Sequence, residues 1–179
     1  MIMLYKELVS STIMHADLHV EHIKEVKRYL QYAMLSHRWE GKEPLLQDIQ
    51  GKCVYDSDLE PVGGMTMLRP FCKTARDAGY NWTWSDTCYI DKSNNLEVQE
   101  SVSSMFVWYH HSALTIVYLS DVLPSSKSCG LAKSAWNTRG WTFQEFIAPK
   151  VILFIRTIGP FIVMIVLPTT RIPSQSCRR

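Results

Sequence analysis

Several side chains that could bind a nucleotide follow two apolar runs of this sequence. Ser36 and Arg38 come at the end of the first run, and the arginine could bind a phosphate or form a surface salt bridge. Trp39 could stack on a base, or it could belong to the core or to a lid. Asp86 ends the second run and could hydrogen-bond a ribose or order the loop that follows it. These residue types predict contacts with a sugar phosphate, with a structural role for each side chain as the alternative.

A second group of candidates lies in residues 134–154. Arg139 could bind a phosphate through two parallel hydrogen bonds, or it could pair with Glu145 or Asp121. Glu145 stands four residues after Trp141, and on this spacing alone it is more simply a residue that caps or solvates a helix. The residues by themselves therefore leave both a binding role and a structural role open.

Neither a metal site nor a cysteine nucleophile is indicated. The five cysteines are scattered and include no Cys-x-x-Cys pair. Cys88 is expected to be a small buried residue, because nothing in the sequence places His110 or His111 beside it. Three histidines have a helical spacing that could hold a metal, but no carboxylate or cysteine completes the set (His15, His19 and His22). We therefore expect no metal and no bound cofactor.

Alternating strands and helices must position these candidates. Short apolar or β-prone runs predict strands over residues 31–36, 82–90, 114–119 and 151–155. Apolar residues at helical spacing predict helices over 68–75 and 98–113, and a helix or a turn and helix over 136–147. This order predicts an α/β fold, with a three-layer parallel sheet, helices on both faces and right-handed crossovers. Ligands bind at the carboxyl ends of strands in such sheets, where Ser36, Arg38 and Asp86 fall.

The composition fits one folded domain. The chain has 179 residues, of which 46% are hydrophobic and 20% are charged, so it can bury a real core. Its 19 lysines and arginines nearly balance its 17 aspartates and glutamates, which gives no broad electrostatic footprint for nucleic acid. The odd number of cysteines and the lack of a signal-like apolar region at the N-terminus favour reduced thiols and a cytoplasmic location.

Three blocks of the sequence resemble the fungal heterokaryon-incompatibility (HET) domain. They are YAMLSHRWEG (residues 32–41), the stretch from Trp82 to Val122, and SAWNTRGWTFQEFIAPKVILF (residues 134–154), in the family's order. Two residues depart from the family pattern: Glu40 stands where glycine is usual, and His37 replaces a frequent tyrosine. The resemblance divides the chain into an N-terminal extension (residues 1–30), a HET domain (31–155) and a divergent tail (156–179).

The HET family is in turn distantly similar to TIR-like domains, which have a flavodoxin-like sheet. Some TIR-like domains cleave NAD at the nicotinamide–ribose bond, using a glutamate in a Trp-x-x-x-Glu block. Trp141 and Glu145 have that spacing, so the resemblance implies that Glu145 is catalytic and that NAD is a substrate. With NAD as the substrate, the candidates named above are expected to contact it (Ser36, Arg38, Trp39, Asp86, Arg139 and Trp141). The implied role is fungal nonself recognition that promotes programmed cell death.

Many TIR-like domains are non-catalytic adaptors, so a signalling module that assembles with like domains is the alternative, as is an inactive fragment. Such a module would self-associate and would answer to an upstream recognition protein that the sequence does not identify. An apolar stripe in the helix expected over 98–113 is assigned mainly to the core, although part of it could form an oligomer surface (Met105, Phe106, Trp108 and Tyr109).

The end of the chain is unusually apolar. Residues 151–167 are interrupted by Arg156, Gly159 and Pro160 and are at the lower limit of a membrane-spanning length, so a membrane span is not favoured. The resemblance assigns 151–155 to the fourth strand. Residues 161–167 match nothing in the family, and they could supply a substitute fifth strand or an aggregation-prone edge. The chain is therefore expected to be a short or truncated version of the domain.

Overall fold

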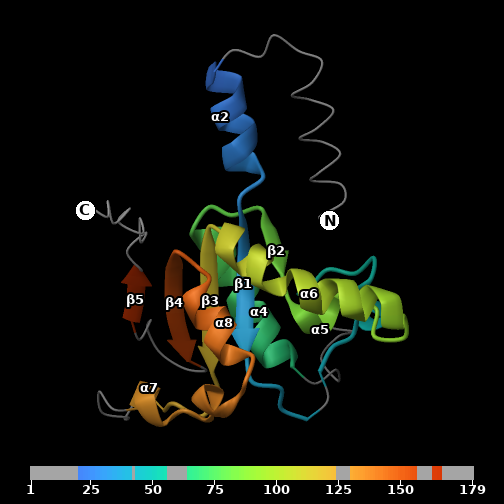
Figure 1. The fold of residues 1–179 in the computed structure, drawn as a ribbon, viewed down its shortest axis with the longest axis vertical. Coiled ribbons are helices and arrows are strands. Elements are labelled where there is room, and N and C mark those ends of the chain that lie inside the picture. Colours follow the sequence, from blue (N-terminus) through green and yellow to red (C-terminus); the bar gives the residue numbers. More distant parts are fainter. Residues whose placement is uncertain (1–19, 42, 56–63, 124–129, 157–162, 167–179) are drawn as a thin grey trace, which may run out of the picture.

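The computed structural model describes residues 20–41, 43–55, 64–123, 130–156 and 163–166. Five strands form one sheet in the order β2-β1-β3-β4-β5 (Figure 1). The strands are β1 (Tyr32–His37), β2 (Trp82–Trp84), β3 (Leu114–Leu119), β4 (Val151–Arg156) and β5 (Val163–Val166). The first four are parallel, and β5 pairs with β4 in the antiparallel direction. The expected α/β fold is confirmed, and its strand order is that of a flavodoxin-like sheet.

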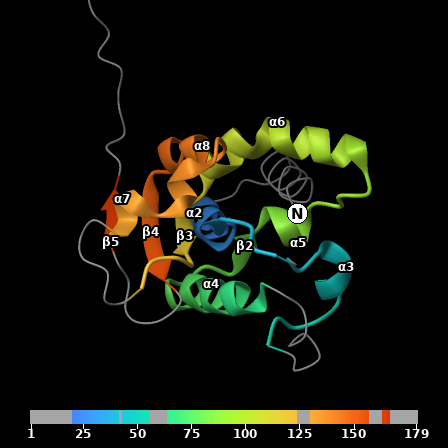
Figure 2. The same ribbon diagram turned by 90° about the horizontal axis from the view of Figure 1, so that it is seen from below.

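Helices cover both faces of the sheet. The longer ones on the faces are α4 (Met65–Asp77) and α6 (Asn95–His111), whereas α2 (Val20–Tyr29) stands beyond the amino end of β1 and covers neither face (Figure 1). The shorter ones are α3 (Leu46–Ile49), α5 (Asp86–Tyr89), α7 (Gly130–Lys133), the 3₁₀ turn η2 (Ala135–Thr138) and α8 (Thr142–Ile147). Viewed from below, α4 lies on one side of the strands, and α6 and α8 lie on the other (Figure 2). This arrangement makes the three layers that the alternation predicts.

Strand β3 lies at the centre of the core, because all six of its residues are buried. Its alternating side chains point to opposite faces of the sheet. Ile116 packs with Leu35 and Phe71 in the cluster beneath α4, whereas Val117 packs with Trp136 on the other face. Full burial of a residue such as Phe71 contributes about 1.5–3 kcal/mol. Apolar runs with this burial are typical of parallel strands covered on both sides.

Helix α6 packs on the sheet through only part of its expected stripe. Met105 and Tyr109 are buried, and Trp108 is half-buried beside the same cluster. The phenol of Tyr109 donates a hydrogen bond to the carbonyl of Leu35 at 2.8 Å, which ties the helix to β1. Phe106 is 44% exposed instead of buried. It lies one residue beyond Met105, and the 100° turn per residue carries it to the outer side of the helix.

The second strand is shorter than its sequence predicts. The strand expected over residues 82–90 ends at Trp84, and the next residues form α5. The amides of Cys88 and Tyr89 both donate to the carbonyl of Ser85, which closes one helical turn. Small polar residues after an aromatic run favour such a turn. Asp86 therefore opens a helix at the carboxyl end of the sheet instead of ending a strand.

Gly64 precedes α4 with a left-handed backbone, at φ +79°. A Cβ at this position would lie 2.5 Å from Cδ of Pro44 and 2.9 Å from a carboxylate oxygen of Glu43. Both the conformation and the close approach require glycine. The entry to α4 is thus packed directly on the loop that follows β1.

The apolar tail supplies a fifth strand, as the sequence allows. Val163 to Val166 pair with β4 residues Phe154 to Val151, which extends the sheet by one antiparallel strand. Among the described residues, no helix has the length and apolar character needed to cross a bilayer. His15 and His19 lie outside the described residues, and so does the side chain of His22, so the expectation for these histidines stays a prediction.

Candidate functional site

Ser36 lies at the centre of a buried hydrogen-bond network at the carboxyl end of β1. Its hydroxyl donates to Oε2 of Glu145 at 2.5 Å and accepts from the indole nitrogen of Trp136 at 2.8 Å. The three residues come from β1, η2 and α8, and Glu145 stands 109 residues after Ser36 in the chain. Their side chains are almost inaccessible, with 1% of Ser36, 3% of Trp136 and 4% of Glu145 exposed. The fold thus places the predicted catalytic carboxylate against a predicted ligand-contacting hydroxyl.

Glu145 has an unusual environment for a carboxylate. Burial raises its pKa above the ordinary value, because the charged form loses hydration. The hydrogen bond from Ser36 and the positive charge of Arg139 act in the opposite direction, whereas the nearby charge of Asp86 raises the pKa further. No described residue hydrogen-bonds the second oxygen of Glu145, Oε1. A buried carboxylate with a shifted pKa is a recognised mark of a functional site, although structural networks shift pKa values too.

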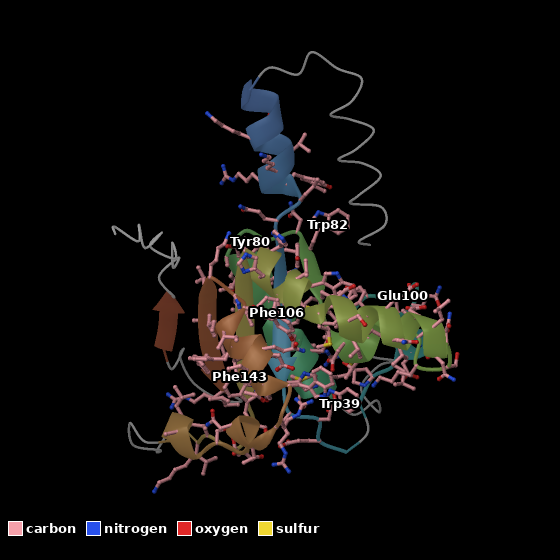
Figure 3. The ribbon with its side chains drawn as sticks, viewed as in Figure 1. Trp39, Tyr80, Trp82, Glu100, Phe106 and Phe143 are labelled. Carbon is pink, nitrogen blue, oxygen red and sulfur yellow. The ribbon has the colours of Figure 1, made fainter. Side chains whose placement is uncertain are left out.

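Trp39 and Asp86 meet just outside this buried network. The indole nitrogen of Trp39 donates to Oδ2 of Asp86 at 3.0 Å, which links the loop after β1 to α5. The ammonium group of Lys92 lies 3.9 Å from the centre of the Trp39 ring, at cation–π distance. The ring is 46% exposed, and Trp39 lies at the carboxyl end of the sheet, opposite the end marked by Tyr80 and Trp82 (Figure 3). Lys92 was not among the residues expected to contact a ligand.

Arg139 connects the inner and outer parts of the site. One guanidinium nitrogen donates to the backbone carbonyl of His37, the last residue of β1. Its guanidinium carbon also lies 6.0 Å from the centre of the Trp39 ring. It influences the pKa of Glu145, so the cation is close to that carboxylate without a direct salt bridge. Of the two structural pairings expected for Arg139, neither forms, because the guanidinium is turned toward β1.

His37 is buried beside a second carboxylate. Its Nε2 lies 3.3 Å from Oε2 of Glu43, and both side chains are largely inaccessible. Burial tends to raise the pKa of Glu43, but hydrogen bonds from His37 and from the amide of Glu40 outweigh it and leave the pKa below the ordinary value. Glu40 in turn accepts a hydrogen bond from Ser120 at 2.6 Å. The unusual glutamate after Trp39 therefore links the ends of β1 and β3.

Two predicted residues lie away from the buried network. Arg38 is exposed. Burial tends to raise the pKa of Asp121, but hydrogen bonds from the amide of Ala135 and the hydroxyl of Ser134, with a smaller effect of the Arg38 charge, leave that pKa below the ordinary value. Trp141 directly precedes α8 and is 47% exposed. Its ring is thus half in solvent, whereas the ring of Trp136 is buried and hydrogen-bonded to Ser36.

Asp121, at the end of β3, holds η2 in place. Its two oxygens accept from the hydroxyl of Ser134 at 2.7 Å and from the amide of Ala135 at 2.6 Å. Trp136 directly follows Ala135, and its backbone carbonyl accepts a hydrogen bond from the hydroxyl of Thr142 at 2.7 Å. Its position directly after a predicted strand marks Asp121 as a candidate at this edge of the sheet, and the sequence offers Arg139 as its partner. The sequence does not predict that Asp121 binds η2 instead.

The cysteines remain separate from this chemistry. Burial raises the pKa of both Cys72 and Cys88 to about 11, so their thiols stay protonated at neutral pH. Cys88 donates to the carbonyl of Pro44 at 3.5 Å and packs in the core under α4. Among the described residues, no group of three ligating side chains is placed to hold a metal ion.

A cavity of about 450 Å³ adjoins the network on its η2 and α8 side. Trp136 and Arg139 line it, together with other residues of α7, η2 and α8 (Leu131, Ala132, Asn137, Thr142, Phe143 and Phe146). Of the predicted site residues, Arg139 alone lines the cavity, and the others, the carboxylate of Glu145 included, are not among its lining residues (Ser36, Arg38, Trp39, Asp86, Trp141 and Glu145). The site thus has a buried carboxylate on one side of the Trp136 ring and an open cavity that borders the same residue.

Comparison with known proteins identifies the family. The chain matches the heterokaryon incompatibility protein (HET) family over residues 32–132, which is more than half of its length. It is also 37% identical over 131 residues to the vegetative incompatibility protein HET-E-1 of Podospora anserina. That match covers 69% of this chain and 9% of the relative, so the chain corresponds to a small part of the larger protein. No solved structure matches. The chain belongs to the HET family.

Proposed function

We propose that this domain acts in the cytoplasm in fungal vegetative incompatibility, and that it promotes cell death by hydrolysing NAD. The family membership and the name of the relative support the biological role. One observation carries the chemical part: the carboxylate of Glu145 is buried against Ser36 at the carboxyl end of β1. Ligands of flavodoxin-like sheets bind at that edge, near the point where the strand order reverses between β1 and β3.

The reaction breaks the bond between the ribose C1′ and the ring nitrogen of nicotinamide. The bonding electrons leave with the nicotinamide, which is already cationic and needs no proton. Positive charge develops on the ribose, and a single carboxylate can stabilise it. Water then adds its oxygen to C1′ and releases a proton to solvent, which yields ADP-ribose.

Two features of Glu145 support this role. Ser36 binds one carboxylate oxygen, which orients the group, and the other oxygen has no hydrogen-bond partner among the described residues. The closely packed ring of Trp136 excludes water from one side, and a charge in a poorly solvated site interacts more strongly with a developing cation. The free oxygen, Oε1, is the atom proposed to face the ribose.

The outer residues would hold the rest of the substrate. Arg139 is proposed to bind the diphosphate, with Arg38 as a second, more exposed cation. Trp39 offers a half-exposed ring for stacking, and Asp86 holds that ring through its hydrogen bond. Trp141, at 47% exposure, is proposed to contact the substrate from the start of α8. NAD is a substrate in this scheme, and no resident cofactor is required.

The test is nicotinamide release from NAD by the purified domain, at a concentration high enough for self-association. Wild-type protein should release nicotinamide, and Glu145→Gln should abolish release while circular dichroism shows an unchanged fold. Glu100→Gln is the matched control, because Glu100 is exposed on α6 (Figure 3) and should leave release unchanged. If assembled wild-type protein leaves NAD intact, the enzymatic proposal is wrong.

A non-catalytic assembly module is the second candidate. The observation that favours it is the exposed apolar surface of α6, where Val102, Phe106 and Val107 are 37%, 44% and 52% exposed. Such a module would associate with like domains on a signal from an upstream recognition protein. Phe106→Glu should then reduce self-association in light scattering and block death signalling in cells, whereas Glu145→Gln should leave both intact. The reverse result favours the enzyme.

A further inference from the structure

The cavity beside Trp136 has firmly held walls. The ring of Trp136 is fixed by its bond to Ser36 and by edge-on contacts with Phe146 and Phe154 at 6.5 and 5.7 Å between ring centres. The side-chain amide of Asn137 donates to the carbonyl of Leu131 at 2.7 Å, which joins η2 to α7. These bonds hold the cavity in place before any ligand enters, and a preformed cavity of about 450 Å³ is of ordinary ligand-binding size.

The lining of the cavity combines aromatic rings with one cation. Trp136, Phe143 and Phe146 supply three rings, and Arg139 is the one charged residue among the described residues that line it. Phe143 is 70% exposed, so a large apolar ring stands uncovered in the lining. In Figure 3, Phe143 lies toward the same end of the molecule as Trp39. Exposed aromatic rings next to an arginine are suited to a flat ring that carries an anion.

The position of Arg139 links this cavity to the rest of the site. The same side chain lines the cavity, donates to the carbonyl of His37 and lies over the ring of Trp39. A phosphate at Arg139 would therefore have an aromatic cavity on one side and the exposed Trp39 ring on the other. A ring, an anion and a second ring follow one another in the same order in a dinucleotide.

We propose that this cavity binds one mononucleotide unit, with its ring against Phe143 and its phosphate on Arg139. This assignment deepens the proposed function, since it names the subsite that would hold half of a dinucleotide. It adds Phe143, Phe146 and Asn137 to the residues implied by the family resemblance. Two mononucleotides share the required chemistry, adenosine monophosphate and nicotinamide mononucleotide, and their relative affinity shows which half is held.

The test is calorimetric titration of the full chain with both mononucleotides and with adenosine, which lacks the phosphate. At least one mononucleotide should bind, and adenosine should bind at least about tenfold more weakly if adenosine monophosphate is the better ligand. Phe143→Ser should weaken binding about 5- to 100-fold, the range expected for one base–aromatic stack. Ile147→Ser is the matched control: Ile147 is exposed on the same helix and outside the lining, so binding should be unchanged.

Arg139 provides the second arm. Arg139→Gln should weaken mononucleotide binding about 10- to 100-fold, the range for a charge-assisted hydrogen bond, and should leave the weaker adenosine binding unchanged. If this variant fails to fold, because its bond to the carbonyl of His37 is lost, Phe143→Ser still decides the question. Equal binding by Phe143→Ser and wild type would overturn the assignment, and so would the absence of mononucleotide binding.

The two proposals fail separately. Mononucleotide binding that depends on Phe143, in a protein that leaves NAD intact, would support the cavity and overturn hydrolysis. NAD cleavage with an unchanged KM in Phe143→Ser would support hydrolysis and overturn the cavity. Repeating the titration in Glu145→Gln removes turnover, and binding to the cavity should persist in that variant.

Discussion

Replacing Ser36 with alanine tests the centre of the buried network. The change removes one hydroxyl that donates to Oε2 of Glu145 and accepts from the indole of Trp136. A hydrogen bond to a charged group contributes about 1.5–3 kcal/mol, and one between neutral groups contributes about 0.5–1.5 kcal/mol. Both partners are buried and would be left unpaired, so Ser36→Ala should lower the free energy of unfolding by about 2–4 kcal/mol. That is a large part of the total stability of an ordinary domain, about 5–15 kcal/mol.

The loss should also depend on pH. The bond from Ser36 lowers the pKa of Glu145, which means that it stabilises the charged carboxylate more than the protonated one. The cost of Ser36→Ala should therefore be greatest near pH 7 and smaller near pH 4, where the carboxyl is largely protonated. This difference separates loss of the hydrogen bond from loss of packing, which would not vary with pH.

Urea unfolding followed by tryptophan fluorescence measures both quantities. Ser101→Ala is the matched control, because Ser101 is a buried serine on α6 whose side chain has no hydrogen bond with the described residues. Its replacement should change stability by less than about 0.5–1 kcal/mol. If Ser36→Ala costs no more than this control at pH 7, the hydroxyl does not organise the site, and the argument for Glu145 loses its foundation.

Three further predictions concern burial and backbone geometry. Burial raises the pKa of Glu145 in the folded state above its ordinary value of about 4.5. Between these two pKa values, the wild-type protein loses folding stability as the pH rises, because the charged carboxylate is favoured in the unfolded chain. Glu145→Gln should therefore gain stability relative to wild type across this pH range, by at most about 1.4 kcal/mol per pH unit. Mass mapping of iodoacetamide labelling at pH 7.5 should find the exposed Cys53 modified far faster than Cys72 and Cys88, whose pKa is about 11. Gly64→Ala should lower the unfolding free energy by about 1–3 kcal/mol in urea titrations, because of its left-handed backbone and close neighbours.

Each of these predictions has a clear contrary outcome. A stability difference between Glu145→Gln and wild type that is flat from pH 4 to 8 would mean that the carboxylate is not desolvated. Rapid labelling of Cys88 would place its thiol at the surface. Gly51→Ala is the matched control for Gly64→Ala, since its φ is +74° but nothing lies within 4 Å of the added carbon. Equal costs for the two glycines would remove the role of the close neighbours.

Local patterns determined most of the fold from the sequence. Continuous apolar runs at residues 114–119 and 151–155 predicted the central strands, because a strand buried on both faces has no polar side. The pattern failed at residues 85–90. There the aromatic run predicts a strand that continues to residue 90, but the chain forms α5 after Trp84. β-propensity takes no account of the local hydrogen bonds that turn the chain at this point. Phe106 was also assigned to the core, although its neighbours fill the inner face of α6.

The candidate site was predictable as a set of residues but not as an arrangement. The family resemblance named Ser36 and Glu145, and the alternation of elements placed Ser36 at the carboxyl edge of the sheet. Nothing local could show that these side chains meet, or that the indole of Trp136 closes the network. No local pattern predicts the hydrogen bond from Arg139 to the carbonyl of His37 either. Such contacts join residues about a hundred positions apart, so they follow only when three elements pack against one sheet.

The sequence by itself therefore determined the class of fold, its layers and the residues capable of chemistry, since these depend on the order and polarity of neighbouring residues. Only the tertiary structure decided which of those residues share a site. It buried Glu145, left Arg38 and Trp141 in solvent, and opened a cavity next to Trp136. The physical reason is that burial and cavity shape arise from the packing of separate elements, and the pattern within any one element does not specify that packing.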